Sequence, residues 1–120
     1  MTSVVIIRAA DVPSNELDGR RIQVLADAGS GATEIEILRG TFAQGRGNLP
    51  HRHDRQEVVV SLGGRAQYRV ADELIDLAEG DVLLIPAGAL HSFEALERFD
   101  GLAVYPSGVR SFDEDGVAVE

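Results

Sequence analysis

The chain has 120 residues and a formal charge of -9 at pH 7, and it contains neither cysteine nor lysine. The length predicts one domain, residues 1–120, with a core that needs no disulfide. The missing residue types exclude thiolate and lysine Schiff-base chemistry, and the acidic charge argues against nucleic acid or an anionic membrane as partner. Without a signal sequence or an apolar run of membrane-spanning length, we expect a cytoplasmic protein with no membrane contact.

Residues 1–10 contain a β-branched run, residues 4–7, that is apolar on both faces and must be covered on both. The run is either an ordinary first strand or an arm that pairs with a partner subunit. Residues 11–19 are predicted to form a loop, punctuated by Pro13, Ser14 and Asn15. A strand is predicted at residues 21–25 and another loop at residues 27–31.

Residues 33–43 are predicted to form a strand that begins by alternating, with its glutamates outside and its isoleucines inside. If this alternation continues, Arg39 also faces inward and can clamp a substrate carboxylate with two hydrogen bonds. Leu38 and Phe42 favour the alternative, in which the parity changes and Arg39 is solvated.

The three histidines lie in two segments that suit a metal site. His51 and His53 are two residues apart in an extended stretch, so both imidazoles leave the same face of one strand, about 6.6 Å apart. Glu57 lies too far along for an unbroken strand, so the polar triplet at residues 54–56 is predicted to turn the chain and return Glu57 on a neighbouring strand. His91 follows a Pro-Ala-Gly turn and can point inward from the start of another strand.

Three neutral imidazoles and one carboxylate suit one divalent transition metal, namely Fe, Mn, Ni, Cu, Co or Zn. Calcium and magnesium fit poorly because they prefer oxygen ligands. The alternative is a solvated His-x-His pair on the surface. The strand pattern, the acid across the turn and the third histidine favour the metal site.

Residues 57–62 are predicted to form a strand that is apolar on both faces. One face carries Glu57 and the other carries Val58, Val60 and Leu62. The outer face therefore requires cover from another sheet layer or from a second subunit, and we expect a homodimer.

The strand predicted at residues 65–70 places Tyr68 inside, either as a phenol donor and candidate catalytic residue in a substrate pocket or as a packed core residue. Phe93 shares the parity of His91, so it forms an apolar wall beside the metal or packs in the core. No pattern determines the orientation of Tyr105.

Further short strands are predicted at residues 74–77, 82–85 (buried) and 99–105, and residues 111–120 are expected to form a loosely held acidic tail. No long helix or internal repeat is present. Short strands separated by Gly- and Asp-containing turns are typical of an antiparallel barrel or sandwich.

The two histidine segments resemble the motifs of the cupin superfamily, in its small single-domain type 2 form. The first motif corresponds to Gly45, His51, His53, Glu57 and Gly64, and the second to Gly80, Pro86, Gly88 and His91, with Ala95 in place of a final Asn. The resemblance implies an all-β fold, the cupin jelly-roll antiparallel β-barrel. It also implies that one metal is held by His51, His53, Glu57 and His91.

The resemblance does not select a reaction, because cupins include oxygenases, isomerases, cyclases, lyases and binding proteins. Metal-free sugar epimerases of this superfamily use an unligated histidine, and this chain has none to spare. A metal-dependent enzyme acting on a small polar or aromatic metabolite is the first hypothesis, with dioxygenase-like chemistry ahead of a redox-neutral isomerase, cyclase or lyase. A non-catalytic protein that binds a metal and a small ligand is the other alternative.

Overall fold

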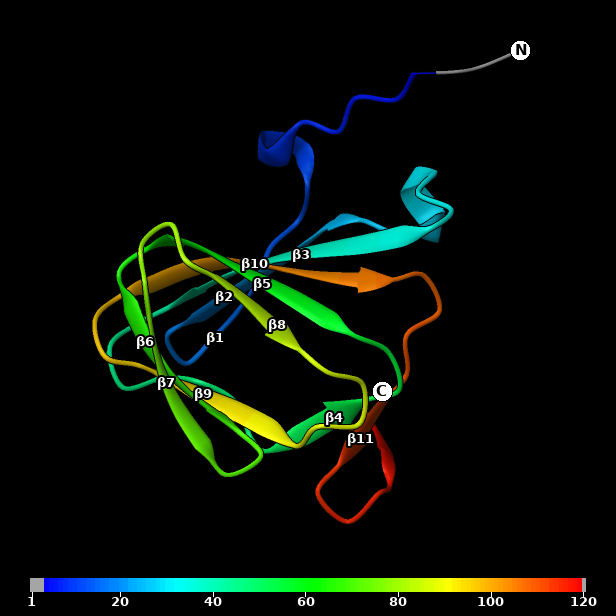
Figure 1. Cartoon of the computed structure of the whole chain (residues 1–120). Helices are drawn as coiled ribbons and strands as arrows, with labels where there is room; N and C mark the ends of the chain where they lie inside the picture. The colour runs from blue at the N-terminus through cyan, green and yellow to red at the C-terminus, as the bar shows by residue number, and fades with distance from the viewer. Residues whose placement is uncertain (1–3, 120) are drawn as a thin grey trace.

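The computed structural model describes residues 4–119, and two six-stranded sheets face each other across a barrel (Figure 1). The first sheet has the order β1 (Asn15–Leu17), β2 (Arg20–Ala26), β3 (Ile35–Phe42), β10 (Phe99–Pro106), β5 (Glu57–Gly63) and β8 (Val82–Ile85). The second has the order β12 (Ala118–Val119), β11 (Ser111–Asp113), β4 (His51–His53), β9 (His91–Ala95), β6 (Arg65–Val70) and β7 (Glu73–Ala78). The all-β jelly-roll prediction is confirmed.

Most connections between β4 and β11 cross from one sheet to the other. Strand β4 belongs to the second sheet, β5 to the first, β8 to the first and β9 to the second. All strand pairs are antiparallel, and β10 lies between β3 and β5. Side chains brought from both sheets therefore point into a common interior.

The barrel interior is filled by alternate residues of the strands, as the period of two requires. Burial alternates along β5 and β6, which confirms the parity predicted for both strands. The buried apolar residues form one cluster: Phe42, Val59, Ala66, Tyr68, Val70, Leu77, Ile85, Ala95 and Phe99.

Glycine is required where the loop before β4 crosses β9. A Cβ on Gly47 would lie 1.8 Å from the carbonyl oxygen of Phe93, so no other residue lets the backbones approach this closely. Nearby, the backbone N–H of Phe93 donates to the side-chain oxygen of Asn48. This hydrogen bond holds the backbone in place immediately before β4, the strand that carries His51 and His53.

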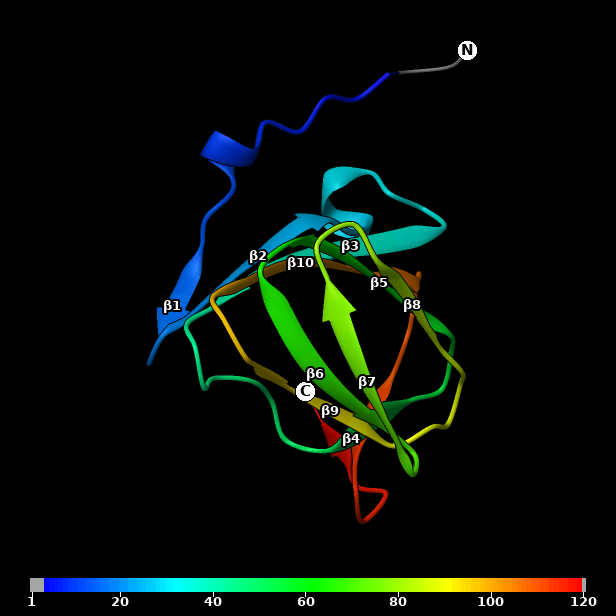
Figure 2. The same ribbon diagram turned by 60° about the vertical axis from the view of Figure 1, so that its left-hand side comes forward.

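The N-terminal region departs from the prediction. Residues 4–7 form no strand, are exposed, and lead away from the barrel (Figures 1 and 2). The expectation of an ordinary first strand there is wrong, and the first strand, β1, lies in the predicted loop instead. The pairing of this arm with a partner subunit stays a prediction, and residues 1–3 of the arm lie outside the described residues.

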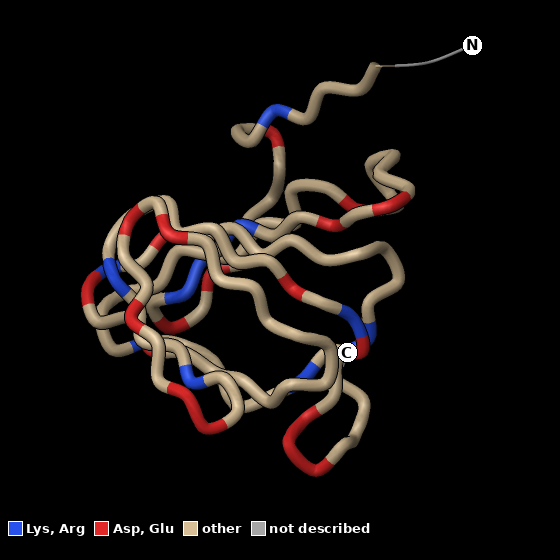
Figure 3. Tube along the Cα trace, in the orientation of Figure 1, with Lys and Arg blue, Asp and Glu red and all other residues tan. Residues whose placement is uncertain are grey.

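The C-terminal region also departs from the prediction. The expected loose tail contains β11, which pairs with β4, and β12, which pairs with β11. Only the tip of this hairpin is strongly acidic, and it forms a continuous red segment in Figure 3. Residue 120, the end of the predicted tail, lies outside the described residues.

Strand β8 is buried on one face only, so the prediction of a fully buried strand is wrong. Its Ile85 is buried, whereas Val82 and Leu84 are exposed. The helical content of residues 4–119 is limited to two 3-10 turns, Ala9–Asp11 and Ala28–Ser30. Neither turn has the length to cross a membrane.

Candidate metal centre

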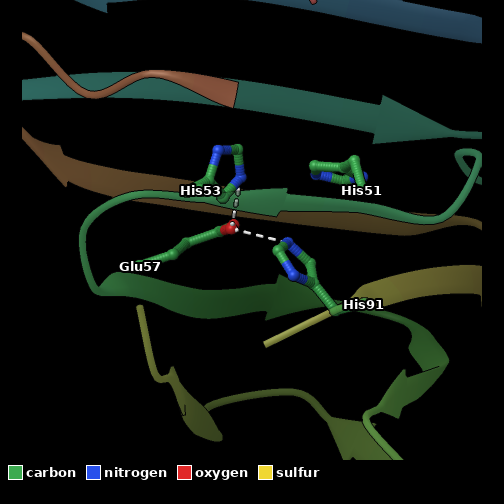
Figure 4. Close-up of side chains that lie close together, drawn as sticks. All are labelled: His51, His53, Glu57 and His91. Carbon is green, nitrogen blue, oxygen red and sulfur yellow. Dashed lines mark hydrogen bonds and ion pairs between the residues drawn. The ribbon is translucent and has the colours of Figure 1, made fainter. Parts of the chain in front are cut away.

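The four predicted ligand residues converge from three strands inside the barrel (Figure 4). Strand β4 supplies His51 and His53, β5 supplies Glu57, and β9 supplies His91. The bend at residues 54–56 carries the chain from one sheet to the other, as predicted, and His51 lies opposite His91 in the β4–β9 pair. One ligand atom from each side chain lies within 4.8 Å of all the others.

Each imidazole is held in orientation by a hydrogen bond at its Nδ1 atom. The partner is the Leu49 carbonyl for His51 at 2.8 Å and the Ala89 carbonyl for His91 at 2.9 Å. A carbonyl oxygen only accepts, so Nδ1 of both rings carries a proton, and in the neutral ring Nε2 carries a lone pair. These outer contacts are the kind that fix tautomer and ring direction in metal-ligating histidines.

The geometry around Glu57 fits a bound cation. Its Oε1 lies 3.1 Å from Nε2 of His91 and 3.2 Å from Nε2 of His53. The His53 contact lacks hydrogen-bond geometry, which leaves this buried Nε2 without a hydrogen-bond partner. A carboxylate oxygen and lone-pair nitrogens that face one another require a proton or a metal ion between them.

The charge state of Glu57 supports the same conclusion. Burial on its own disfavours the carboxylate, but contacts with His53 and His91 outweigh burial and lower the pKa of Glu57 to about 2. The side chain is therefore an anion at neutral pH. Burial lowers the pKa of His51, and this keeps that imidazole neutral and available as a ligand.

A cavity of about 200 Å³ adjoins the cluster, and its lining includes His51, Glu57 and His91. Its remaining wall is mostly apolar and aromatic, with Phe42, Tyr68, Phe93, Phe99 and Tyr105. A small molecule in this cavity therefore meets both predicted metal ligands and aromatic rings.

Tyr68 and Phe93 both line the cavity, where the sequence places them as candidates for substrate contact. Their rings stack, with centroids 4.9 Å apart and planes 20° apart. Burial raises the pKa of the Tyr68 and Tyr105 hydroxyls above their ordinary value, and the nearby Glu57 charge adds to this effect. Both phenols are therefore neutral O–H groups at physiological pH.

Of the two alternatives for Arg39, the inward orientation is wrong. Its guanidinium makes two hydrogen bonds to Asp100 of the neighbouring strand, at 3.1 and 2.6 Å, and the side chain does not line the cavity. Leu38 and Phe42 line the cavity, as the favoured alternative requires, whereas the inward orientation predicted for the isoleucines at the start of β3 is wrong, because Ile35 is exposed. The Phe42 ring packs edge-on against Phe93, and this contact decides which face is inside.

Sequence reasoning missed the side chain that orients His53. Nδ1 of His53 lies 2.7 Å from Oγ of Ser111, which comes from strand β11. The two residues are 58 positions apart, and Ser111 lies in the segment expected to be a loose tail. No local pattern marks it; only the β4–β11 pairing, in which Ser111 faces His53, brings the two together.

Comparisons with known proteins agree with this architecture. The polyketide cyclase RemF from Streptomyces resistomycificus is similar over 87% of this chain and 80% of its own, at 18% identity and a TM-score of 0.76. KdgF from a Halomonas species is similar over 88% and 94%, at 18% identity and a TM-score of 0.75. Oxalate decarboxylase from Bacillus subtilis matches over 90% of this chain but 31% of its own, at 22% identity and a TM-score of 0.78.

The TM-scores show a common fold, and at these low sequence identities the similarity leaves the reaction open. No curated protein sequence matches the chain. The sequence model of the cupin domain matches residues 38–105, which is more than half of the chain and includes both histidine segments. The chain belongs to the cupin family.

Proposed function

We propose that this protein is a metal-dependent enzyme that holds one divalent transition metal through His51, His53, Glu57 and His91. It acts on a small molecule bound in the adjoining cavity. The observation that carries the proposal is the set of three imidazoles, each fixed at Nδ1, that gather within 4.8 Å of one buried carboxylate, with Nε2 of His53 and His91 in contact with it. Such pre-orientation has no use in a core that merely packs.

Bound in this place, the metal would supply Lewis-acid activation of a substrate oxygen and, with a redox-active ion, oxidation chemistry. The residues of the chain supply binding and protons. Tyr68 and Tyr105 are neutral donors beside Glu57, able to donate hydrogen bonds to oxygen atoms of a substrate. The apolar walls exclude water from the same space and so strengthen these polar contacts.

Oxygenase chemistry of the dioxygenase type is the preferred reaction class. Isomerases and lyases need a proton acceptor with a pKa near neutrality. The lining imidazoles, those of His51 and His91, are assigned as metal ligands and are therefore not free to accept a proton. The Glu57 pKa is about 2, and the phenol pKa values lie above their ordinary value. With the metal bound, no described residue lining the cavity is left as a proton acceptor of this kind, so chemistry driven by the ion is favoured.

A redox-neutral cyclase or lyase is the second candidate. It is supported by the two buried phenols, which can protonate or orient a carbonyl oxygen inside an apolar cavity. The fold is also used by a polyketide cyclase and an oxalate decarboxylase, and reports on the latter describe Mn(II) centres. Dioxygen consumption separates the two candidates, because only the oxygenase requires it.

The first test is elemental analysis of the purified protein, together with the variants His91→Gln and Glu94→Gln. Both substitutions lie on β9, but Glu94 is exposed and outside the cluster. We expect about one equivalent of metal in the unmodified protein and in Glu94→Gln, and at least tenfold less in His91→Gln. Full metal content in His91→Gln contradicts the proposed site.

Activity is then tested with the metal-loaded protein in substrate screens with and without dioxygen. Substrate-dependent oxygen uptake that disappears in His91→Gln supports the oxygenase. Turnover at the same rate without dioxygen assigns the redox-neutral class. Ligand binding without conversion under either condition identifies a non-catalytic binding protein.

A further inference from the structure

We propose that the cavity selects a neutral aromatic compound of one ring system, with an oxygen-bearing group directed at the four clustered side chains. This inference rests on the proposed metal-dependent function and narrows its substrate class. It depends on the shape and chemistry of the cavity wall, which are independent of the metal.

The wall offers ring surfaces on several sides. The rings of Phe42 and Phe93 meet edge-to-face with centroids 4.8 Å apart, and the Phe93 and Phe99 centroids are 5.8 Å apart. Tyr68 stacks on Phe93, with ring centroids 4.9 Å apart. A planar aromatic ligand can join this arrangement through further edge-to-face or stacked contacts, each of which adds to the gain from burial alone.

The same wall is unsuited to charge. Among the described residues that line it, none is lysine or arginine, and Glu57 is the single acidic residue. The one arginine expected to serve as an anion clamp, Arg39, is bound to Asp100 outside the cavity. A carboxylate or phosphate placed away from the metal end would therefore be buried without a partner, which is strongly unfavourable.

The volume limits the size of the ligand. About 200 Å³ lies below the roughly 300–1,000 Å³ typical of pockets for drug-sized molecules. One ring system with a short oxygen-bearing substituent fits this space, whereas a long chain or an oligosaccharide does not. Ala103, a small residue on β10 that faces the cavity, helps to keep this space open.

The test compares hydroxamic acids, which share one metal-chelating group and differ only in what extends into the cavity. The protein is loaded with Zn²⁺, which has no redox chemistry, and its zinc stoichiometry is measured first. Acetohydroxamic, benzohydroxamic and 4-carboxybenzohydroxamic acids are then titrated calorimetrically. We expect the phenyl compound to bind at least tenfold more tightly than either the methyl or the carboxylated compound.

Two variants locate the selectivity. Ala103→Leu fills the cavity, and Val104→Leu, the matched control, changes the adjacent residue, which faces the opposite side of β10. We expect Ala103→Leu to weaken benzohydroxamic acid at least tenfold and acetohydroxamic acid less than threefold. Val104→Leu leaves both affinities within threefold.

The outcomes separate this inference from the function on which it rests. If the protein binds no zinc, both are overturned. If zinc binds but the phenyl compound gains less than tenfold over the methyl compound, or the carboxylated compound binds as well, the aromatic inference alone is overturned. The comparison on the unmodified protein decides the matter even if Ala103→Leu fails to fold.

Discussion

His53 differs from the other two ligand histidines because a side chain, the hydroxyl of Ser111, holds its Nδ1 atom. The corresponding contacts of His51 and His91 use backbone carbonyls, which no substitution removes. With Nε2 directed at the cluster, Nδ1–H of His53 donates to the Ser111 oxygen, and this contact stabilises the ligating tautomer.

Replacing Ser111 with alanine is therefore expected to weaken zinc binding roughly tenfold, at the lower end of what such outer contacts contribute. Ser111→Thr retains the hydroxyl and is expected to bind within threefold of the unmodified protein. Ser92→Ala on β9 serves as the control for the loss of a hydroxyl. Competition with a chromophoric chelator measures the affinity, and equal affinities for Ser111→Ala and Ser92→Ala would contradict the assigned contact.

The ionisable groups of the cluster also make the metal-free protein sensitive to pH. Burial opposes the charged form of His91, but the hydrogen bond to Glu57, the hydrogen bond to the Ala89 carbonyl and the Glu57 charge together outweigh burial and raise the His91 pKa above 6.5. The stability from this group is complete below pH 6.5 and is lost as pH rises through the raised pKa. The pKa of His51 is lowered, so the stability that this group contributes is lost as pH falls below 6.5. The stability contributed by Glu57 is lost as pH falls from 4.5 to about 2.

The His91 window lies above pH 6.5 and the windows of His51 and Glu57 lie below it, so the cluster stabilises the metal-free protein most near pH 6.5. We expect the free energy of unfolding in urea with EDTA to fall between pH 6.5 and 8 in the unmodified protein relative to His91→Gln. The comparison with this variant cancels the contributions of groups that do not interact with His91. A difference between the two proteins that does not change over this range would show that the His91–Glu57 pair has no such linkage.

At the scale of elements, β4 depends on the C-terminal hairpin. β4 has three residues, and only His51 is in register with β9, whereas all three pair with β11. The backbone N–H groups of Asp54 and Arg110 add a reciprocal contact at the end of this pair, to the Arg110 carbonyl and the Asp54 carboxylate. The hairpin therefore holds both the backbone and one imidazole of the metal site.

Two truncations test this dependence. Removal of residues 111–120 takes away Ser111 and the ladder on β4, and we expect at least tenfold weaker zinc binding with a lower melting temperature. Removal of residues 114–120 keeps β11, and we expect zinc affinity within threefold of the full chain. Isothermal titration with zinc and thermal unfolding give both readouts, and unchanged affinity in the longer truncation would exclude the hairpin from the site.

The limits of prediction from sequence follow from how each element is specified. Strand β6 alternates over six residues, and the period alone was enough to place Tyr68 inside. The turn between His51 and Glu57 could also be predicted locally, because their spacing in the sequence requires it. In contrast, β1, β11 and β12 have two or three residues each and are specified by their pairing partners, which no short window contains.

The error in the parity at the start of β3 has the same origin. The partner of Arg39, Asp100, is 61 positions away, and Phe42 contacts Phe93 across 51 positions of the chain. Local alternation at the start of β3 favoured burial of the isoleucines, yet Ile35 is 47% exposed. Long-range packing of the larger aromatic ring outweighed the short pattern.

At the scale of the whole molecule, the part of the first sheet's outer face formed by β5, β8 and the end of β10 is apolar and exposed in the single chain. Residues 58 and 60 of β5 pair with residues 84 and 82 of β8, and both β8 side chains, Leu84 and Val82, are more than half exposed. Val104 of β10 extends the surface on the other side of β5. A contiguous exposed apolar face of this kind marks an interaction surface, and the self-complementary use of one face gives a two-fold dimer.

We therefore expect the protein to behave in light scattering as a homodimer, with twice the 12.9 kDa mass of one chain. Leu84→Asp places a charge in the centre of the buried contact and is expected to give a monomer at micromolar concentration. Leu74→Asp is the matched control, since Leu74 is 56% exposed against 58% for Leu84 but lies on β7 in the other sheet. A dimer that survives Leu84→Asp and dissociates with Leu74→Asp would move the interface to the second sheet. If the unmodified protein is a monomer, the predicted homodimer is wrong, and the apolar face would bind a different partner.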